Sequence, residues 1–363
     1  MLISAGVASE HLLLLVLTGI SSDMDISRES RVAVQIRALQ AAEEIAEGSP
    51  SPPPDNEDPR WRRTLVAVVE GQAVGFATLA LNPATDTYFC EVSVSPAFRR
   101  RGIGSRLFTA VQQVADHRLP IVGRVMSSQP LRRPFAEHLG GSVLLHCPMP
   151  SIDPTSVAGQ QWTAAQLLPD GYETTRMTDV PAEEVQAAWS AYFSWAHQPL
   201  GRTRADALPT VWDDYRSGID DTLSYLCRDA DGQIVAFSFV SPDIWDGRTF
   251  IVAETANRDQ PLGVSVLQAT LAASLRALAD RGIQRVEIEG HSTDSHIPQL
   301  FETLPAGPSD PLDIYLLSPR CDPASELSAT SRTGDMRLWG ARGTLGRIVS
   351  VALQPELRWG SPR

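Results

Sequence analysis

The amino-acid sequence predicts an α/β protein built from two tandem copies of one domain. The chain has 363 residues, more than a single hydrophobic core usually organises. Residues 68–81 (VVEGQAVGFATLAL) recur as residues 227–240 (CRDADGQIVAFSFV), with the Gly-Gln pair and the Val-x-Phe pattern kept. Three further landmarks follow in the same order at almost the same spacing, which indicates a duplication.

Each copy has the same predicted order of elements. The first begins with a helix, two hairpin strands and a further strand, over residues 28–47, 64–70, 73–81 and 88–94. The matching elements of the second lie over residues 181–196, 222–228, 233–240 and 248–254. A turn and a long amphipathic helix follow in both copies, and a strand and a short helix close each unit.

Domain boundaries follow from composition. The stretch 147–162 is rich in Pro, Ser and Gly and lacks a sustained helix or strand pattern, which is typical of a connection. We therefore predict an N-terminal domain over 1–150, a linker over 151–165 and a C-terminal domain over 166–363. The Pro-rich acidic stretch 47–60 is predicted to be a surface loop.

Charge is shared unevenly between the halves. The chain contains no lysine, and its composition, 43% hydrophobic and 20% charged, is that of a globular protein. Residues 1–150 hold 15 acidic side chains against 14 arginines, whereas residues 151–363 hold 28 against 17. The acidic second half argues against nucleic acid or an anionic membrane as a partner, and it would attract a cationic ligand.

The cysteines predict neither a disulfide framework nor a metal site, because they are far apart and no histidine stands at metal-ligand spacing. They are Cys90, Cys147, Cys227 and Cys321. We expect reduced thiols and a cytoplasmic protein. The apolar segment 11–20 (HLLLLVLTGI) is too short to span a bilayer and no basic residue precedes it, so we expect a buried element or an over-extended start rather than a signal peptide.

One short stretch points to an anionic ligand. Residues 92–107 (VSVSPAFRRRGIGSRL) read as a strand, a tight turn and the start of a helix. Free backbone N–H groups at a helix N-terminus attract phosphate, and the glycines allow the backbone to approach it. Three consecutive arginines, Arg99 to Arg101, add positive charge to the turn.

The pattern V-x-V-x-P-x-x-R-x-x-G-x-G, filled from Val92 to Gly104, resembles the acyl-CoA pyrophosphate loop of the GNAT N-acetyltransferase superfamily. The element order is similar to that family well over residues 25–150 and loosely over 170–320. The resemblance implies two GNAT-like domains, each a mixed, mostly antiparallel sheet flanked by helices, with a splayed strand pair for the pantetheine arm. Tandem members of this kind often keep activity in one copy.

By that resemblance the co-substrate is acetyl-CoA or another acyl-CoA, and no metal takes part. The residues that would bind it are Val92, Ser93, Val94, Arg99, Arg100, Arg101, Gly102, Ile103, Gly104 and Ser105. The Val94 N–H would also polarise the thioester carbonyl. In the second copy Asp259 and Pro261 replace the favourable turn residues, so we expect that copy not to bind CoA productively.

Proton transfer is less well specified. The tyrosine that many family members use as the general acid is replaced by Ala136 in one copy and Phe301 in the other. Ser127, Ser128, Tyr88 or a water are the substitutes. Glu91, on the strand that enters the turn, is the candidate base, but it could equally pair with an arginine, and water could serve instead.

Candidate acceptor-binding residues are Tyr88, Trp195, His197 and Asp294. The stretch 289–298 (EGHSTDSHIP) gathers histidines and an aspartate, but without a G-x-S-x-G elbow it indicates a capped turn rather than a hydrolase. Trp195 and His197, at a predicted helix end, would more often be core residues than a substrate wall.

Three functions remain open. The favoured one is acyl transfer from CoA to the amine of a small acceptor, cationic or amino-acid-like. The second takes the acyl group from a carrier protein, as in natural-product biosynthesis, and would use Arg99 to Arg101 with Arg132 and Arg133 as a landing patch. The third is an acyl-CoA-binding module without turnover, favoured by the missing tyrosines.

Overall fold

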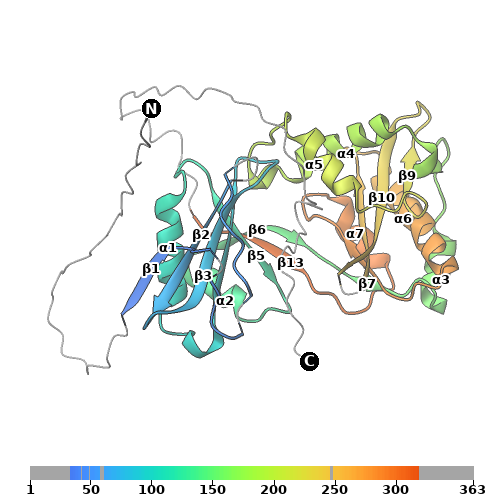
Figure 1. Ribbon diagram of the computed structural model, residues 1–363. Helices are drawn as coiled ribbons and strands as arrows, with labels where there is room; N and C mark the ends of the chain where they lie inside the picture. Colours follow the sequence, from blue (N-terminus) through green and yellow to red (C-terminus); the bar gives the residue numbers. More distant parts are fainter. Residues whose placement is uncertain (1–32, 42, 49, 58–60, 246–247, 319–363) are drawn as a thin grey trace, which may run out of the picture. The chain divides into compact units, whose positions relative to one another are not determined.

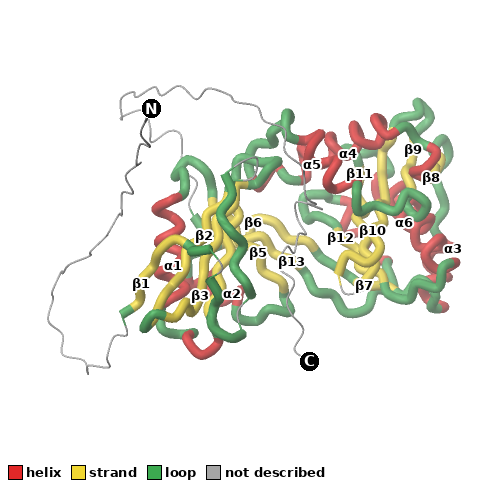
Figure 2. Tube along the Cα trace, viewed as in Figure 1, coloured by secondary structure: helices red, strands yellow, loops and turns green. Residues whose placement is uncertain are grey.

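A computed structural model describes residues 33–41, 43–48, 50–57, 61–245 and 248–318 (Figures 1 and 2). The apolar segment 11–20 and Cys321 lie outside these residues. All described elements belong to one compact unit that begins at Val34. None of the helices in the described ranges has the length and apolar composition needed to cross a bilayer.

The first sheet has seven strands in the order β1-β2-β3-β4-β5-β13-β6. Its strands are β1 (Val34–Ala38), β2 (Arg62–Val69), β3 (Gln72–Leu81), β4 (Tyr88–Val94), β5 (Ile121–Met126), β6 (Ser142–Cys147) and β13 (Leu312–Leu316). Only the β4–β5 pair is parallel. Helices α1 (Ile103–Val114) and α2 (Arg132–His138) accompany it, and α1 packs against β2, β3 and β4.

The second sheet has six strands in the order β7-β12-β11-β10-β9-β8. Its strands are β7 (Ser151–Ile152), β8 (Glu173–Arg176), β9 (Tyr225–Arg228), β10 (Ile234–Trp245), β11 (Arg248–Thr255) and β12 (Val286–Glu289). Its helices are α3 (Val157–Ala165), α4 (Ala182–Ala196), α5 (Leu208–Arg216), α6 (Gly263–Asp280) and α7 (His296–Thr303). The β11–β12 pair is parallel and the other pairs are antiparallel. The predicted fold class is confirmed.

The repeated segment forms the same hairpin in both sheets. In the first, β2 and β3 are joined by Glu70 and Gly71, both with positive φ (49° and 82°), which is the conformation that a tight two-residue hairpin turn requires. Gly232, at the matching place between β9 and β10, has φ 77°. The duplicated Gly-Gln pair therefore marks a backbone requirement that both copies share.

Two local predictions were wrong. A helix was predicted over 28–47, but the described residues of this range, 33–41 and 43–47, contain β1 and no helix. β1 pairs with β2 and packs Val34 and Ile36 against the core, so sheet pairing overrides the local helix preference of the alanines and glutamates. The stretch predicted to lack regular structure contains β7 and α3. Ser156 caps α3 by accepting a hydrogen bond of 3.0 Å from the Gly159 amide.

The chain also returns to the first sheet at its last described strand. β13 inserts between β5 and β6 and buries Leu312, Ile314 and Tyr315. Residues of the predicted C-terminal domain thus complete the first sheet, a pairing that a simple division at residues 150 and 166 does not describe. Because such a pairing joins strands far apart in the chain, no local signal predicts it. The division into two domains stays a prediction.

Candidate functional site

The turn after β4 has the backbone shape that the sequence predicts. β4 ends at Val94, a short 3₁₀ turn spans Pro96–Phe98, and α1 begins at Ile103. Arg100 and Gly102 both have positive φ (63° and 75°). A Cβ on Gly102 would meet no atom within 4 Å, so the glycine serves the backbone conformation rather than a tight space.

The amides of this turn are available to a ligand. Within the described part of the chain, no hydrogen bond uses a backbone N–H of residues 100–105, whereas the Arg106 amide bonds to the Gly102 carbonyl at 3.2 Å. Several donors therefore lie together at the N-terminus of α1, where the helix dipole favours an anion. This arrangement can hold a phosphate or diphosphate group.

The arginines of the turn are exposed. The Arg99 Nε donates to the Val94 carbonyl at 2.9 Å, and the Arg101 Nη2 donates to the Ala97 carbonyl at 3.1 Å. The Arg101 guanidinium also lies 5.3 Å from the centre of the Phe98 ring. These contacts brace the turn, while the positive charge stays at the surface beside the free amides.

A second set of amides lies in β4. The parallel β4–β5 pairing stops at Phe89 and Val122, and beyond that point the two strands separate. The Ser95 amide bonds to Val74 of β3 at 2.8 Å, and Val94 is the opposite partner of Gly75. Because N–H groups alternate in direction along a strand, the amides of Val92 and Val94 point away from β3, toward the opening beside β5.

The second sheet has the same strand separation, but two of its donors, the amides of Thr255 and Gly263, are bonded within the protein. The β11–β12 pairing stops at Val252 and Glu289. The Thr255 amide, which corresponds to that of Val94, donates to the Asp294 carboxylate at 3.4 Å. The Gly263 amide at the start of α6 bonds to the Gln260 carbonyl at 3.0 Å.

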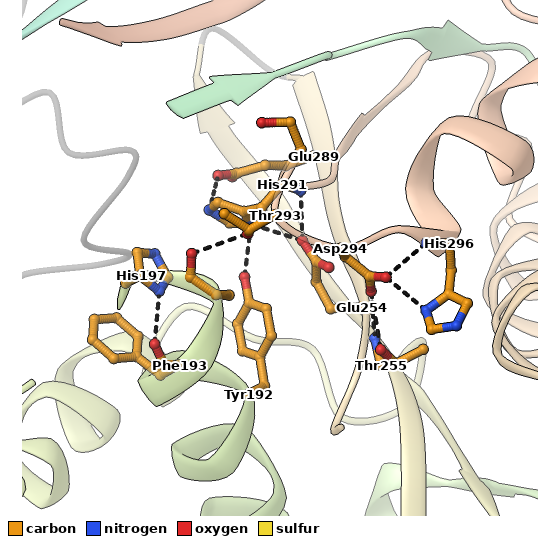
Figure 3. Close-up of polar contacts among 12 residues, drawn as sticks. Tyr192, Phe193, His197, Glu254, Thr255, Glu289, His291, Thr293, Asp294 and His296 are labelled. Atoms are coloured by element: carbon orange, nitrogen blue, oxygen red, sulfur yellow. Dashed lines mark hydrogen bonds and ion pairs between the residues drawn. The ribbon is translucent and has the colours of Figure 1, made fainter. Parts of the chain in front are cut away.

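Figure 3 shows Asp294 held between Thr255 and His296. Asp294 Oδ1 lies 2.6 Å from the His296 Nδ1 and accepts a bond from the His296 amide at 2.8 Å, so it caps the start of α7. The His296 ring fills the space beside Gly263. In the second copy the Asp294 carboxylate therefore occupies the amide that corresponds to that of Val94.

The candidate base and acids have protein partners. Glu91 accepts a bond of 2.8 Å from Arg132, and both side chains are about one quarter exposed (26% and 28%), so this pair contributes little to stability. Ser127 Oγ and the Ser128 amide both donate to Asp310, at 2.8 and 2.7 Å. The structure thus places each of these residues on a hydrogen-bond partner, and their roles stay predictions.

The four candidate acceptor residues do not gather at one place on the first copy. Tyr88 is buried beside Trp61, with ring centres 5.4 Å apart. Trp195 donates to the Ala256 carbonyl at 3.1 Å. His197 is buried and stacks on Phe193 at 4.0 Å. These contacts, like the cap that Asp294 provides, are structural interactions within the protein.

A buried group of ionisable residues was not predicted. Glu254 from β11, Glu289 from β12 and His291 just beyond it are at most 2% exposed. Burial, followed by the Asp294 charge, raises the pKa of Glu254 well above its ordinary value, and burial raises the pKa of Glu289 to about 7. Burial lowers the pKa of His291. The signal in the sequence was the pair of glutamates within otherwise apolar strands.

Comparison with known proteins agrees with this geometry. A family model described as "Acetyltransferase (GNAT) family" matches residues 33–140. A mycothiol acetyltransferase of Saccharomonospora viridis is 29% identical over 266 residues, which cover 69% of this chain and 84% of that protein.

Two solved structures share the fold. A tandem GNAT protein from the clavulanic acid biosynthesis pathway aligns with a TM-score of 0.51 at 17% identity, over 79% of this chain and 99% of its own. A GCN5-related N-acetyltransferase from Sphaerobacter thermophilus aligns with a TM-score of 0.50 at 17% identity, over 71% and 82%. The GNAT family uses acetyl-CoA as its co-substrate. Residues 33–140 thus match the GNAT acetyltransferase family, and the chain is similar in sequence to a mycothiol acetyltransferase and in fold to a tandem GNAT protein.

Proposed function

We propose that the first copy transfers an acetyl group from acetyl-CoA to the amine of a small acceptor by direct attack on the thioester. The observation that supports this most is the run of unused amides over residues 100–105 at the N-terminus of α1. The diphosphate of CoA would lie there, close to Arg99, Arg100 and Arg101. The pantetheine arm would run along β4 toward the opening beside β5.

The chemical step would use the Val94 amide. As the amine attacks, negative charge develops on the thioester oxygen, and an N–H directed at it stabilises the transition state. One such donor contributes about 3 to 4 kcal/mol in other acyl transferases. The amine reaches the thioester unprotonated or loses its proton to Glu91, freed from Arg132, or to water. Ser127, Ser128 or a water would protonate the thiolate that leaves.

Charge and one relative guide the choice of acceptor. Residues 151–363 carry an excess of eleven acidic side chains over arginines, which would attract a cation. The relative from Saccharomonospora viridis is named for mycothiol. A panel of acceptors should therefore contain polyamines, aminoglycosides, amino-acid amides and the acceptor of mycothiol acetyltransferases.

The test is release of free CoA thiol with acetyl-CoA and this panel, repeated on Val94→Pro. Proline at 94 deletes an N–H that makes no bond to β3, so the sheet keeps its hydrogen bonds. We expect kcat to fall by about 10²- to 10³-fold while CoA still binds. A folded Val94→Pro enzyme with unchanged kcat would contradict the assigned role of this amide. If CoA binds but no acceptor is acetylated, then either the true acceptor is missing from the panel or acetyl-CoA is not the donor.

The donor itself is tested in the same assay. A carrier protein that bears an acetylated phosphopantetheine replaces acetyl-CoA, and Arg132→Ala with Arg133→Ala removes part of the predicted landing patch. Faster transfer from the carrier than from CoA, lost in the double variant, would favour the carrier as donor. If wild type and double variant transfer the acetyl group from the carrier protein at equal rates, the arginines are not a landing patch, and CoA is favoured as the donor.

A further inference from the structure

Three side chains with metal-ligating atoms meet at a buried place away from the turn of residues 100–105. They are Cys147 at the end of β6, Glu289 at the end of β12 and His291 two residues later, and their exposed fractions are 0%, 0% and 2%. One ligand atom of each lies within 4.8 Å of the others. Tetrahedral zinc sites need separations of about 3.3 to 3.8 Å, since the bonds are about 2.0 to 2.3 Å long, so side-chain shifts of about 1 Å suffice.

Backbone bonds hold Cys147 at this place. The His146 carbonyl accepts a bond of 2.9 Å from the Ser292 amide, and Ser292 Oγ accepts one of 3.2 Å from the His146 amide. Three residues after Cys147, the Pro150 carbonyl bonds to the Ile288 amide at 3.0 Å. The segment that leaves β6 is therefore fixed beside β12 on both sides of Cys147.

His291 is oriented as a metal ligand would be. Its Nδ1 lies 2.7 Å from Glu254 Oε1 and 2.8 Å from the Tyr192 hydroxyl, and Glu254 also accepts the His291 amide at 2.8 Å (Figure 3). An Nδ1–H that donates to Glu254 leaves the Nε2 lone pair directed the other way. Metal-bound histidines commonly have such a carboxylate partner on their second nitrogen, which fixes the tautomer and the ring.

The atoms on the other side of the ring form an ion-pair contact but no hydrogen bond within the described part of the chain. Among the described residues, His291 Nε2 and both carboxylate oxygens of Glu289 are buried without a hydrogen bond, and Nε2 lies 3.5 Å from Glu289 Oε1. Leaving buried polar atoms unsatisfied is costly, so an unexplained group of this kind calls for a ligand. Glu289 and His291 also line a cavity of about 20 Å³, room for one water, together with Tyr215, whose hydroxyl is likewise unpaired.

We propose that Cys147, Glu289 and His291 bind one zinc ion, with a water in the cavity as the fourth ligand. A set of one sulfur, one nitrogen and one oxygen ligand suits zinc, whereas magnesium and calcium prefer oxygen alone. Binding displaces the thiol proton of Cys147 to solvent, and the resulting thiolate and carboxylate balance the two charges of the ion. The ion would join the end of β6 to β12, and the proposal does not depend on the acetyl-transfer site.

The test uses the full chain, stripped with a chelator, refilled with zinc or cobalt and desalted. We expect one zinc per chain by mass spectrometry of the elements, a higher melting temperature with zinc, and thiolate-to-cobalt absorption in the cobalt form. Absence of the thiolate band in the wild-type cobalt protein, or no retained zinc, overturns the proposal. Because these measurements use the wild-type protein, misfolding of a variant cannot affect them.

Variants then identify the ligands. In Cys147→Ser the thiolate band should vanish and zinc affinity should fall by at least tenfold, and Glu289→Gln should lower affinity similarly while keeping the band. Glu254→Gln, which alters only the partner of His291, should weaken binding by about 10- to 100-fold. Cys227→Ser removes another buried thiol and should bind zinc as wild type does. Equal binding by Cys147→Ser and Cys227→Ser would refute the ligand assignment.

Discussion

Arg100 allows the binding and folding roles of the phosphate turn to be separated. Its φ of 63° is a conformation that costs an L-residue about 1 to 2 kcal/mol, whereas glycine adopts it freely. Glycine also gives the unfolded chain more freedom, which costs about 0.5 to 1 kcal/mol. Arg100→Gly should therefore leave the free energy of unfolding unchanged or raise it by up to about 1 kcal/mol.

The same substitution should weaken CoA binding. A guanidinium about 6 Å from a phosphate charge, at an effective dielectric constant of about 40, is attracted by about 1.4 kcal/mol, which is tenfold in Kd. Salt screens exposed charges over about 8 Å at physiological ionic strength, so the difference from wild type should shrink as salt is added. Calorimetric titration with CoA at low and physiological salt measures both effects.

Glu70→Gly is the matched control. Glu70 is exposed, has φ 49° and lies in the β2–β3 hairpin turn, so it gains the same conformational relief without a charge at the proposed site. Both variants should unfold in urea at similar or higher concentrations than wild type, and only Arg100→Gly should lose CoA affinity. If Arg100→Gly folds and binds CoA with the wild-type Kd at low salt, the diphosphate does not lie at this turn.

Three further predictions concern stability and reactivity. Gly75→Ala should lower the free energy of unfolding in urea by about 1 to 3 kcal/mol, because its Cβ would lie 2.6 Å from the Ser93 carbonyl oxygen of β4; wild-type stability would contradict that contact. Ile314→Ala, at a side chain that is 1% exposed in β13, should lower the free energy of unfolding by about 2 to 5 kcal/mol. A chain that ends at residue 150 should not unfold cooperatively on heating, because β5 and β6 lose the strand between them. Cooperative unfolding of this fragment would show that the first copy folds alone. Burial raises the pKa of Cys90 to about 12 and that of Cys227 to about 11, so both thiols of the native protein should resist iodoacetamide at about pH 8. Labelling, followed by mass spectrometry of peptides, should increase as the pH rises toward those values. Rapid labelling at neutral pH would contradict their burial.

Local signals in the sequence explain which parts of the fold could be predicted. The β2–β3 hairpin and α1 follow from a Glu-Gly turn, two apolar-rich strands and an apolar helical stripe, all contained within short segments of the chain. The turn before α1 was predicted for the same reason, since its glycines and arginines are consecutive. β1 was missed because its partner β2, rather than its own composition, decides its conformation.

The parts that were not predicted depend on distant pairings. β13 pairs with β5 and β6, which lie far from it in the sequence, and no residue near β13 predicts this position. Likewise Glu254 and His291 meet because β11 and β12 are neighbours, although 37 residues separate them. For the candidate site, the residue types at the turn could be predicted from the sequence. The pairing of Glu91 with Arg132 and the bond between Asp294 and Thr255 could not.

One difference between the two copies is that the amides of Thr255 and Gly263 are bonded within the protein in the second copy. Both sheets separate after a parallel pair, and both are followed by a helix that begins after a residue with positive φ, Gly102 in one and Leu262 in the other. In the second copy, Asp294 takes the amide at the opening and the His296 ring lies beside Gly263. CoA bound at this amide would have to displace the bond from the Thr255 amide to the buried Asp294 carboxylate, and losing a hydrogen bond to a charged group costs about 1.5 to 3 kcal/mol. The first copy has no such cost, so CoA should bind there even though both copies share one fold.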